Sequence, residues 1–92
     1  MTDQMQEARG EINRIDEEIA RLFVQRMQAV ERAAAYKRAH GLPVLDAGRE
    51  QALIARNLSF IDSTELRAYY EPLQREMLRV SRLYQERLAQ KD

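Results

Sequence analysis

Apolar residues recur at intervals of three and four along the N-terminal part of the chain, which is the spacing of an amphipathic helix. The predicted helix covers about residues 5–39, and neither proline nor glycine interrupts it between Gly10 and Gly41. At about 1.5 Å per residue it would be roughly 50 Å long, more than the width of a globule of this size. It therefore cannot cover its own apolar stripe and needs partners along its length. The stripe includes Met5, Ala8, Ile12, Ile15, Ile19, Leu22, Phe23, Val30 and Ala33.

A short second helix follows the first after a sharp break. Gly41 is typical of a helix C-terminus, and Pro43 prevents the first helix from continuing, so residues 40–46 are expected to form a loop. Asp46 has a short side chain with acceptor oxygens and is a good N-cap. The second helix is therefore predicted over about residues 47–58.

The third predicted helix covers about residues 64–89. Asp62 and Glu65 precede and begin it at the spacing of a capping box. Pro72 lies inside this helix, which predicts either a kink or a helix that begins near Glu71. The expected fold class is all-α, with one very long, one short and one medium helix in a single domain that covers the 92 residues.

Composition excludes several classes of protein. Fifteen basic and fifteen acidic residues give a formal net charge of zero, so electrostatics does not favour nucleic acid or an anionic membrane as a partner. The chain has no cysteine, which excludes disulfides and thiol chemistry and argues against a zinc site. No apolar run approaches the length of a membrane span, and the start "MTDQMQEARGEI" has no apolar signal segment. We therefore expect a soluble cytoplasmic protein.

Two cations lie inside the apolar stripe of the first helix. On a helical wheel with Leu22 at zero, Arg26 falls near about 40° and Lys37 near about 60°. Five stripe residues fall between roughly 20° and 80° on the same wheel: Ile12, Ile15, Ile19, Val30 and Ala33. A cation in a buried stripe is costly unless an anion pairs with it, and no carboxylate lies beside these two on the stripe. Their side chains could reach solvent instead. The alternative is a site for a small dianion, since eleven residues correspond to roughly 16 Å of rise.

Further polar residues also have both a structural interpretation and a ligand-binding one. Arg9 borders the same stripe about 25 Å from Arg26, too far for one site in one chain, although in an antiparallel dimer it could reach the partner's site. Ser81 and Gln85 are four residues apart and interrupt the apolar stripe of the third helix, where they indicate a polar helix contact or a ligand site. Each signal is weak alone, but together they favour an anion-binding site.

The loop segment "GLPVLDAGRE" contributes three more candidates. Asp46 alone is explained as an N-cap, and Arg49 with Glu50 alone would form a solvated helix face. All three follow the bend that turns the chain back over the first helix. They strengthen the set of candidate site residues, although each of them alone has a local explanation.

These residues, in this order, resemble the AroQ class of chorismate mutases, the small all-helical type. The resemblance covers nearly the whole chain and rests on I-x-x-I-D-x-x-I-x-x-L-x-x-x-R, on P-V-x-D-x-x-R-E and on "SRLYQ". It implies an intertwined homodimeric helical bundle whose long first helices pair, with Arg9 contributed across subunits to each active site. It also implies conversion of chorismate to prephenate in phenylalanine and tyrosine biosynthesis, with no metal and no cofactor.

The resemblance also implies roles for individual residues. Arg26 and the partner's Arg9 would bind the two substrate carboxylates, and Ser81 would assist at one of them. Lys37 and Gln85 would meet the ether oxygen, where negative charge develops. A compact ammonium suits that position because it focuses its charge on one atom.

The remaining candidates would hold the ring end of the substrate. Glu50 would accept from the ring hydroxyl, helped by the backbone at Asp46, and Arg49 would order the turn by pairing with nearby acids. The alternatives are an isochorismate pyruvate-lyase or an aminochorismate mutase on the same fold, or a non-catalytic helical dimerisation module. Glu50 favours chorismate, because those related enzymes tend to lack an acid after the loop arginine. A dimerisation module would tolerate Lys37→Arg.

Overall fold

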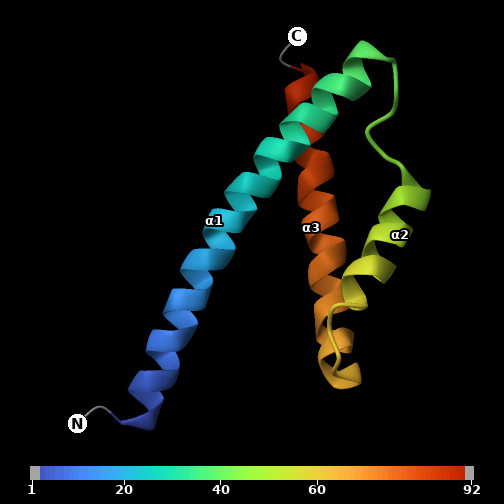
Figure 1. Ribbon diagram of the computed structural model, residues 1–92. Coiled ribbons are helices and arrows are strands. Elements are labelled where there is room, and N and C mark those ends of the chain that lie inside the picture. Colours follow the sequence, from blue (N-terminus) through green and yellow to red (C-terminus); the bar gives the residue numbers. More distant parts are fainter. Residues whose placement is uncertain (1–2, 91–92) are drawn as a thin grey trace.

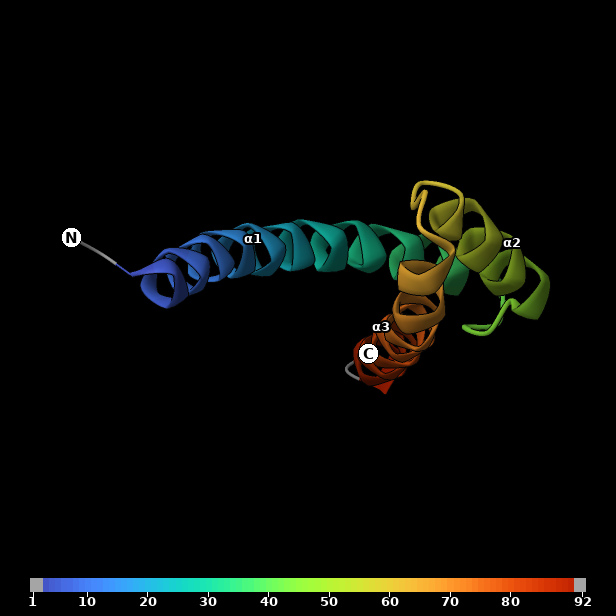
Figure 2. The ribbon, with the colours of Figure 1, turned by 90° about the horizontal axis from the view of Figure 1, so that it is seen from below.

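The computed structural model describes residues 3–90, which form three helices and no strand. The helices are α1 (Gln4–Ala39), α2 (Ala47–Leu58) and α3 (Thr64–Gln90). Figure 1 shows α2 and α3 beside the C-terminal half of α1, while the N-terminal half extends away from them. Figure 2 shows the same separation from a second direction. The prediction of an all-α fold with three helices is confirmed.

The C-terminus of α1 has a Schellman motif, which fixes the direction of the following loop. Gly41 has a φ of 65°, a left-handed conformation that glycine adopts without steric cost. The Leu42 N–H donates to the Lys37 carbonyl at 2.8 Å, and the Gly41 N–H donates to the Arg38 carbonyl at 3.4 Å. The chain therefore reverses where the sequence predicted, and the loop returns over the last turns of α1.

The N-termini of the other two helices are capped by short polar side chains. Asp46 caps α2, as predicted, and accepts from the Arg49 N–H at 3.0 Å. The predicted capping box that starts at Asp62 is wrong, because the Ser63 hydroxyl accepts from the Leu66 N–H at 3.1 Å. Ser63 directly precedes the first residue of α3, so its oxygen reaches the third N–H of the helix, as a cap requires.

Helix α3 continues through Pro72. The alternative start near Glu71 is therefore wrong. Proline has no N–H to donate to the carbonyl four residues earlier, which here belongs to Ala68. Pro72 and Ala68 are both exposed, so water can hydrogen-bond the carbonyl that the proline leaves without a partner.

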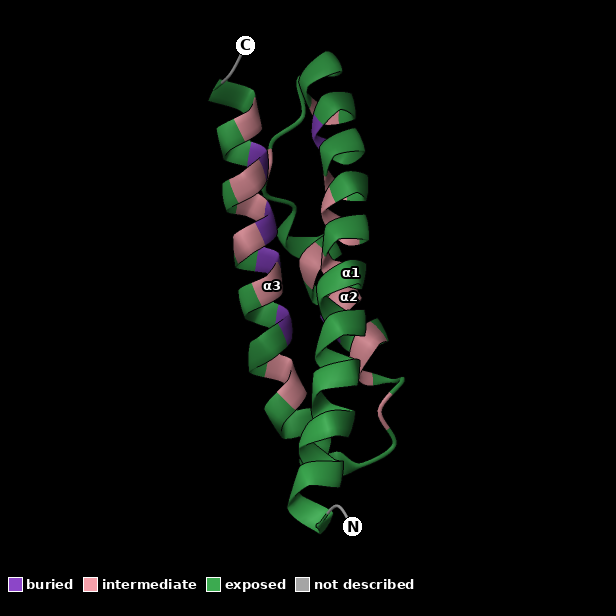
Figure 3. Cartoon of the chain, turned by 90° about the vertical axis from the view of Figure 1, so that its left-hand side faces the viewer, coloured by how far each residue is buried: buried purple, intermediate pink, exposed green. Residues whose placement is uncertain are grey.

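The buried residues lie where the three helices meet. Ala34, Ile54 and Leu78 are the buried apolar side chains of the described range. Gln74, Ser81 and Gln85 of α3 are also buried, and Figure 3 shows the buried positions of α3 along the side that faces α1. Half of this core is therefore polar, and all of its polar members come from one face of α3.

Hydrogen bonds across the helices support this small core. The Tyr84 hydroxyl of α3 donates to Glu31 of α1 at 2.5 Å, and this bond raises the pKa of Tyr84. The Asn57 amide of α2 donates to the Gln74 side chain of α3 at 2.6 Å. These bonds fix α3 against both α1 and α2.

The rest of α1 leaves its apolar stripe uncovered. Ile12, Ile19 and Leu22 are 54%, 55% and 59% exposed. The chain exposes 7502 Å², whereas a compact monomer of 10.8 kDa exposes about 5,500 Å². Its radius of gyration is 16.9 Å, against about 12 Å for a compact chain of this length. The single chain is therefore extended and exposes far more apolar surface than a stable monomer does.

Candidate active site

A cavity of about 160 Å³ lies between the C-terminal half of α1, the loop with α2, and α3. All the predicted site residues except Arg9 line it. The structure thus brings together side chains from three segments that lie far apart in the sequence. The lining consists of Arg26, Val30, Lys37, Val44, Asp46, Arg49, Glu50, Leu53, Leu78, Ser81, Arg82 and Gln85.

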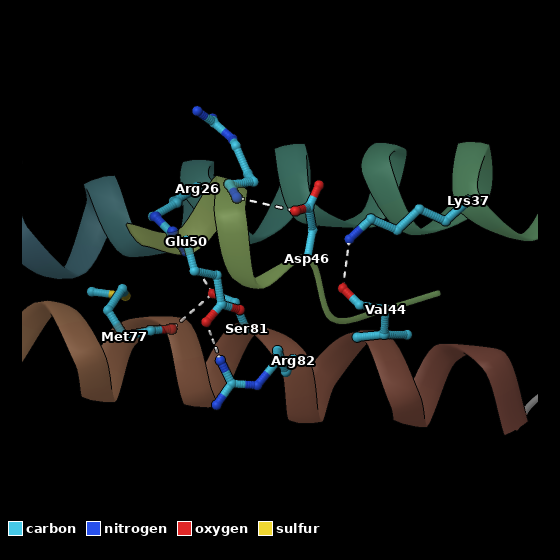
Figure 4. Close-up of polar contacts among 9 residues, drawn as sticks. Arg26, Lys37, Val44, Asp46, Glu50, Met77, Ser81 and Arg82 are labelled. Carbon is cyan, nitrogen blue, oxygen red and sulfur yellow. Dashed lines mark hydrogen bonds and ion pairs between the residues drawn. The ribbon is translucent and has the colours of Figure 1, made fainter. Parts of the chain in front are cut away.

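Arg26 is oriented by a neutral partner. Its Nη1 donates to the Ser81 hydroxyl oxygen at 2.5 Å, and that hydroxyl donates in turn to the Met77 carbonyl at 2.8 Å (Figure 4). Ser81 is buried, so its single proton is committed to the helix backbone and its oxygen faces the guanidinium. The bond fixes Arg26 without neutralising its charge, and a guanidinium in this position retains donors for a carboxylate.

Lys37 links the loop to α3. Its ammonium donates to the Val44 carbonyl at 2.8 Å, as Figure 4 shows, and to Gln85 Oε1 at 3.0 Å. A lysine only donates, so the Gln85 amide must turn its oxygen to Lys37, which leaves its two N–H donors available. The ammonium keeps a third proton. Lys37 and Gln85 can therefore both donate to one acceptor atom in the cavity.

Glu50 of α2 and Arg82 of α3 form an ion pair in the lining of the cavity. Arg82 Nη1 lies 2.5 Å from Glu50 Oε1, and the two side chains are 29% and 21% exposed (Figure 4). Sequence reasoning missed Arg82. The signal was present, because Arg82 lies three residues before Gln85 and so projects from nearly the same face of the helix.

Asp46 and Arg49 act in the turn through the cap. The Asp46 carboxylate accepts from the Arg49 backbone N–H, and the Asp46 carbonyl accepts from the Glu50 N–H at 3.0 Å. The expectation that the Arg49 side chain orders this turn by pairing with acids is not met: within residues 3–90 its guanidinium has no ion pair. The backbone bond already fixes the turn, so the side chain is not needed for it.

Arg9 lies outside the cavity of its own chain. It is exposed on the N-terminal half of α1, which extends away from α2 and α3 (Figure 1). Seventeen residues of helix separate it from Arg26, or about 25 Å. Arg9 therefore cannot complete the site of its own chain.

The arrangement supports binding and electrostatic stabilisation. Its cations and amide donors surround one small cavity. The single histidine of the chain, His40, does not line this cavity, and its ring stacks on that of Tyr36 with 4.0 Å between the ring centroids. Among the described residues, no three histidine, cysteine, aspartate or glutamate side chains cluster so as to hold a metal ion. None of the helices described is long and apolar enough to cross a membrane.

The fold and the cavity define an all-helical protein whose pocket is lined by four cations and two carboxylates. The family model for chorismate mutase type II matches residues 8–86, and the chain belongs to this family. The match includes every residue that lines the cavity as well as Arg9. Comparison with curated proteins and with solved structures gave no match.

Proposed function

We propose that this protein is a chorismate mutase, which rearranges chorismate to prephenate. The observation that carries the proposal is the placement of the Lys37 ammonium and the Gln85 amide beside each other, in the same cavity as Arg26. In this Claisen rearrangement a C–O bond breaks while a C–C bond forms within one molecule. The reaction requires neither a nucleophile nor a proton transfer, and a pocket of fixed donors suits it.

The proposed mechanism combines positioning with charge stabilisation. Arg26, held by Ser81, binds one carboxylate of chorismate and keeps the enolpyruvyl arm over the ring, which restricts rotations that are free in water. Lys37 and Gln85 donate to the ether oxygen, where negative charge develops as its bond to the ring breaks. Because Val44 and Ser81 orient the two cations beforehand, these donors need little reorganisation during the reaction.

Glu50 supports chorismate as the substrate over the substrates of the two related enzymes, the isochorismate pyruvate-lyase and the aminochorismate mutase. Its carboxylate lies in the first turn of α2 and lines the cavity. In the proposed complex it accepts a hydrogen bond from the ring hydroxyl of the substrate. The backbone at Asp46, which begins the same turn, assists it.

The activity is tested by following the ultraviolet absorbance of chorismate with the purified protein and identifying the product. Fast conversion to prephenate, without added metal or coenzyme, is the expected result. Conversion of isochorismate with release of pyruvate would instead assign the chain to the lyase branch. If a folded protein acts on neither compound, the proposal is wrong and the cations of the cavity need another explanation.

We further infer that the active form is an intertwined homodimer in which Arg9 serves the partner's site. The uncovered stripe of α1 supports this, as does an exposed surface about 2,000 Å² larger than that of a compact monomer. Stable dimer interfaces bury areas of this order. Arg9 is too far from the cavity of its own chain to serve it. If the stripes of two chains pair, the partner's first helix would bring its own Arg9 to that cavity.

Mixed dimers test the origin of Arg9. An Arg9→Ala chain and a Lys37→Ala chain are each expected to be nearly inactive alone. When they are mixed and exchanged, a heterodimer has one intact site if Arg9 acts across the interface, and activity returns. If Arg9 acts within its own chain, each site of the heterodimer lacks one residue and no activity returns.

A further inference from the structure

Arg82 lines the cavity and has no role in the proposed mechanism, but unlike Arg49 it forms an ion pair there with another described residue. Its pair with Glu50 joins α2 to α3 and is largely buried. Four other ion pairs of the described chain each lie within one helix and are well exposed: Arg14–Glu18, Arg21–Glu17, Arg75–Glu71 and Arg79–Glu76. Exposed pairs of that kind contribute little to stability. The Glu50–Arg82 pair differs from them in both burial and location.

We propose that Arg82 is a positioning residue, which holds Glu50 so that one carboxylate oxygen binds Arg82 and the other accepts from the substrate's ring hydroxyl. This inference rests on the proposed mutase activity. The contact uses Oε1 of Glu50 and leaves Oε2 without a protein partner in the described range. A glutamate has three rotatable side-chain bonds. Without a partner, the Glu50 carboxylate would therefore point to solvent in some rotamers and into the cavity in others. The bond to α3 restricts it to the cavity.

Charge gives Arg82 a second effect on the same contact. Chorismate carries two carboxylates, and a lone glutamate in its pocket would repel them. The guanidinium of Arg82, at 2.5 Å, offsets the charge of Glu50 while leaving it a strong acceptor. Arg82 therefore lets the site present a carboxylate to the hydroxyl of a dianionic substrate.

The test compares two substrates, chorismate and an analogue in which hydrogen replaces the ring hydroxyl. Arg82→Met keeps much of the side-chain volume and removes the charge. It is expected to lower kcat/KM for chorismate about ten- to a hundredfold, the range for losing a charge-assisted hydrogen bond. With the analogue the loss should be clearly smaller, because no hydroxyl is present for Glu50 to bind and only the repulsion between Glu50 and the two carboxylates remains.

Three further variants complete the design. Glu50→Gln should show the same substrate dependence, and adding Arg82→Met to it should cause little further loss. Arg82→Lys should restore part of the activity on chorismate. Arg79→Met is the matched control, since Arg79 pairs with Glu76 on the exposed face of α3, and it should leave both substrates unaffected.

The outcomes separate this inference from the mutase proposal. Equal losses on both substrates would overturn the inference, because Arg82 would then support the fold or bind a carboxylate. An unchanged Arg82→Met in an active protein would also overturn it. A wild-type protein inactive on chorismate would overturn the mutase proposal and this inference together. If circular dichroism shows that Arg82→Met does not fold, Arg82→Lys and Glu50→Gln make the same comparison of substrates.

Discussion

The two halves of α1 share one apolar stripe but have different surroundings. From Ile12 to Leu22 the stripe is exposed, although Ile19 lines a pocket together with residues of α3. Beyond Leu22 the stripe faces α3 and the loop, and there Arg26 and Lys37 interrupt it. The meaning of a polar residue in an apolar stripe therefore depends on what covers the stripe. In the covered half the cations form a pocket, whereas the bare half is an apolar surface that its own chain leaves exposed.

The largest effect is expected from the covered half. Lys37→Ala and Arg26→Ala should each remain folded and lower the rate about 10²–10³-fold or more, because each removes a preorganised charge. Steady-state kinetics with chorismate measures this. Arg32→Ala is the matched control, since Arg32 is an exposed cation on the same helix and lies outside the cavity. Near-wild-type turnover in Lys37→Ala or Arg26→Ala would refute the assigned roles.

Lys37→Arg separates catalysis from dimerisation in the same half. It should also be severely impaired, because a planar guanidinium cannot contact the Val44 carbonyl and Gln85 as the compact ammonium does. An interface ion pair would tolerate this exchange.

The bare half should respond through assembly. Ile19→Asp places a charge in the exposed stripe and should dissociate the proposed dimer, with loss of most helical structure and activity. Sedimentation and circular dichroism measure both. Val24→Asp is the matched control, because Val24 is similarly exposed but lies on the opposite side of the helix. If Ile19→Asp stays dimeric, the stripe is not the interface.

Gln85 predicts how activity depends on pH. An amide donates at any pH, so the wild-type rate should vary little between mildly acid and neutral pH. Gln85→Glu should lose about tenfold or more at neutral pH and recover as the pH falls, because a carboxyl must be protonated to donate. Lys37 at 3.0 Å favours the ionised form of the new carboxyl and shifts the recovery to more acid pH. Profiles of kcat/KM against pH test this, and a steep wild-type loss on raising the pH would contradict it.

The smallest effects are expected when alanine replaces either of two glycines, Gly10 or Gly41. Nothing lies within 4 Å of a Cβ added at Gly10 or Gly41, so backbone conformation alone decides the outcome. Gly41→Ala should lower the free energy of unfolding by about 1 kcal/mol, because φ is 65° there. Gly10→Ala, in the middle of a helix, should raise it by up to about 1 kcal/mol. Urea unfolding measures both, and equal signs would refute the explanation.

The sequence predicted the helices because their ends carry local signals. Gly41 and Asp46 each act through contacts within a few residues, so a single sequence is enough to locate them. The cap of α3 was misplaced because Asp62 and Ser63 are both good caps, and the choice depends on which residue directly precedes the helix. A start near Glu71 was considered because Pro72 disfavours a helix interior, but an exposed carbonyl can use water instead.

The candidate site was predicted less completely, because it depends on which helix faces meet. Stripe position identified Arg26 and Lys37, since a cation among apolar residues is conspicuous. Arg82 has less contrast: its position three residues before Gln85 places it near the site, but α3 carries several arginines and its partner Glu50 lies on another helix. Only the packing of α2 on α3 reveals that pair.

The cavity carries a charge that the whole chain lacks. Four cations and two carboxylates line it, which leaves two positive charges at one place in a chain of zero net charge. A dianion is therefore matched locally but is not attracted from a distance. At physiological ionic strength the electrostatic field of the pocket is screened within about 8 Å. The pocket therefore attracts an anionic ligand only near the mouth of the cavity. Added salt should consequently weaken the binding of the ligand more than it slows the encounter.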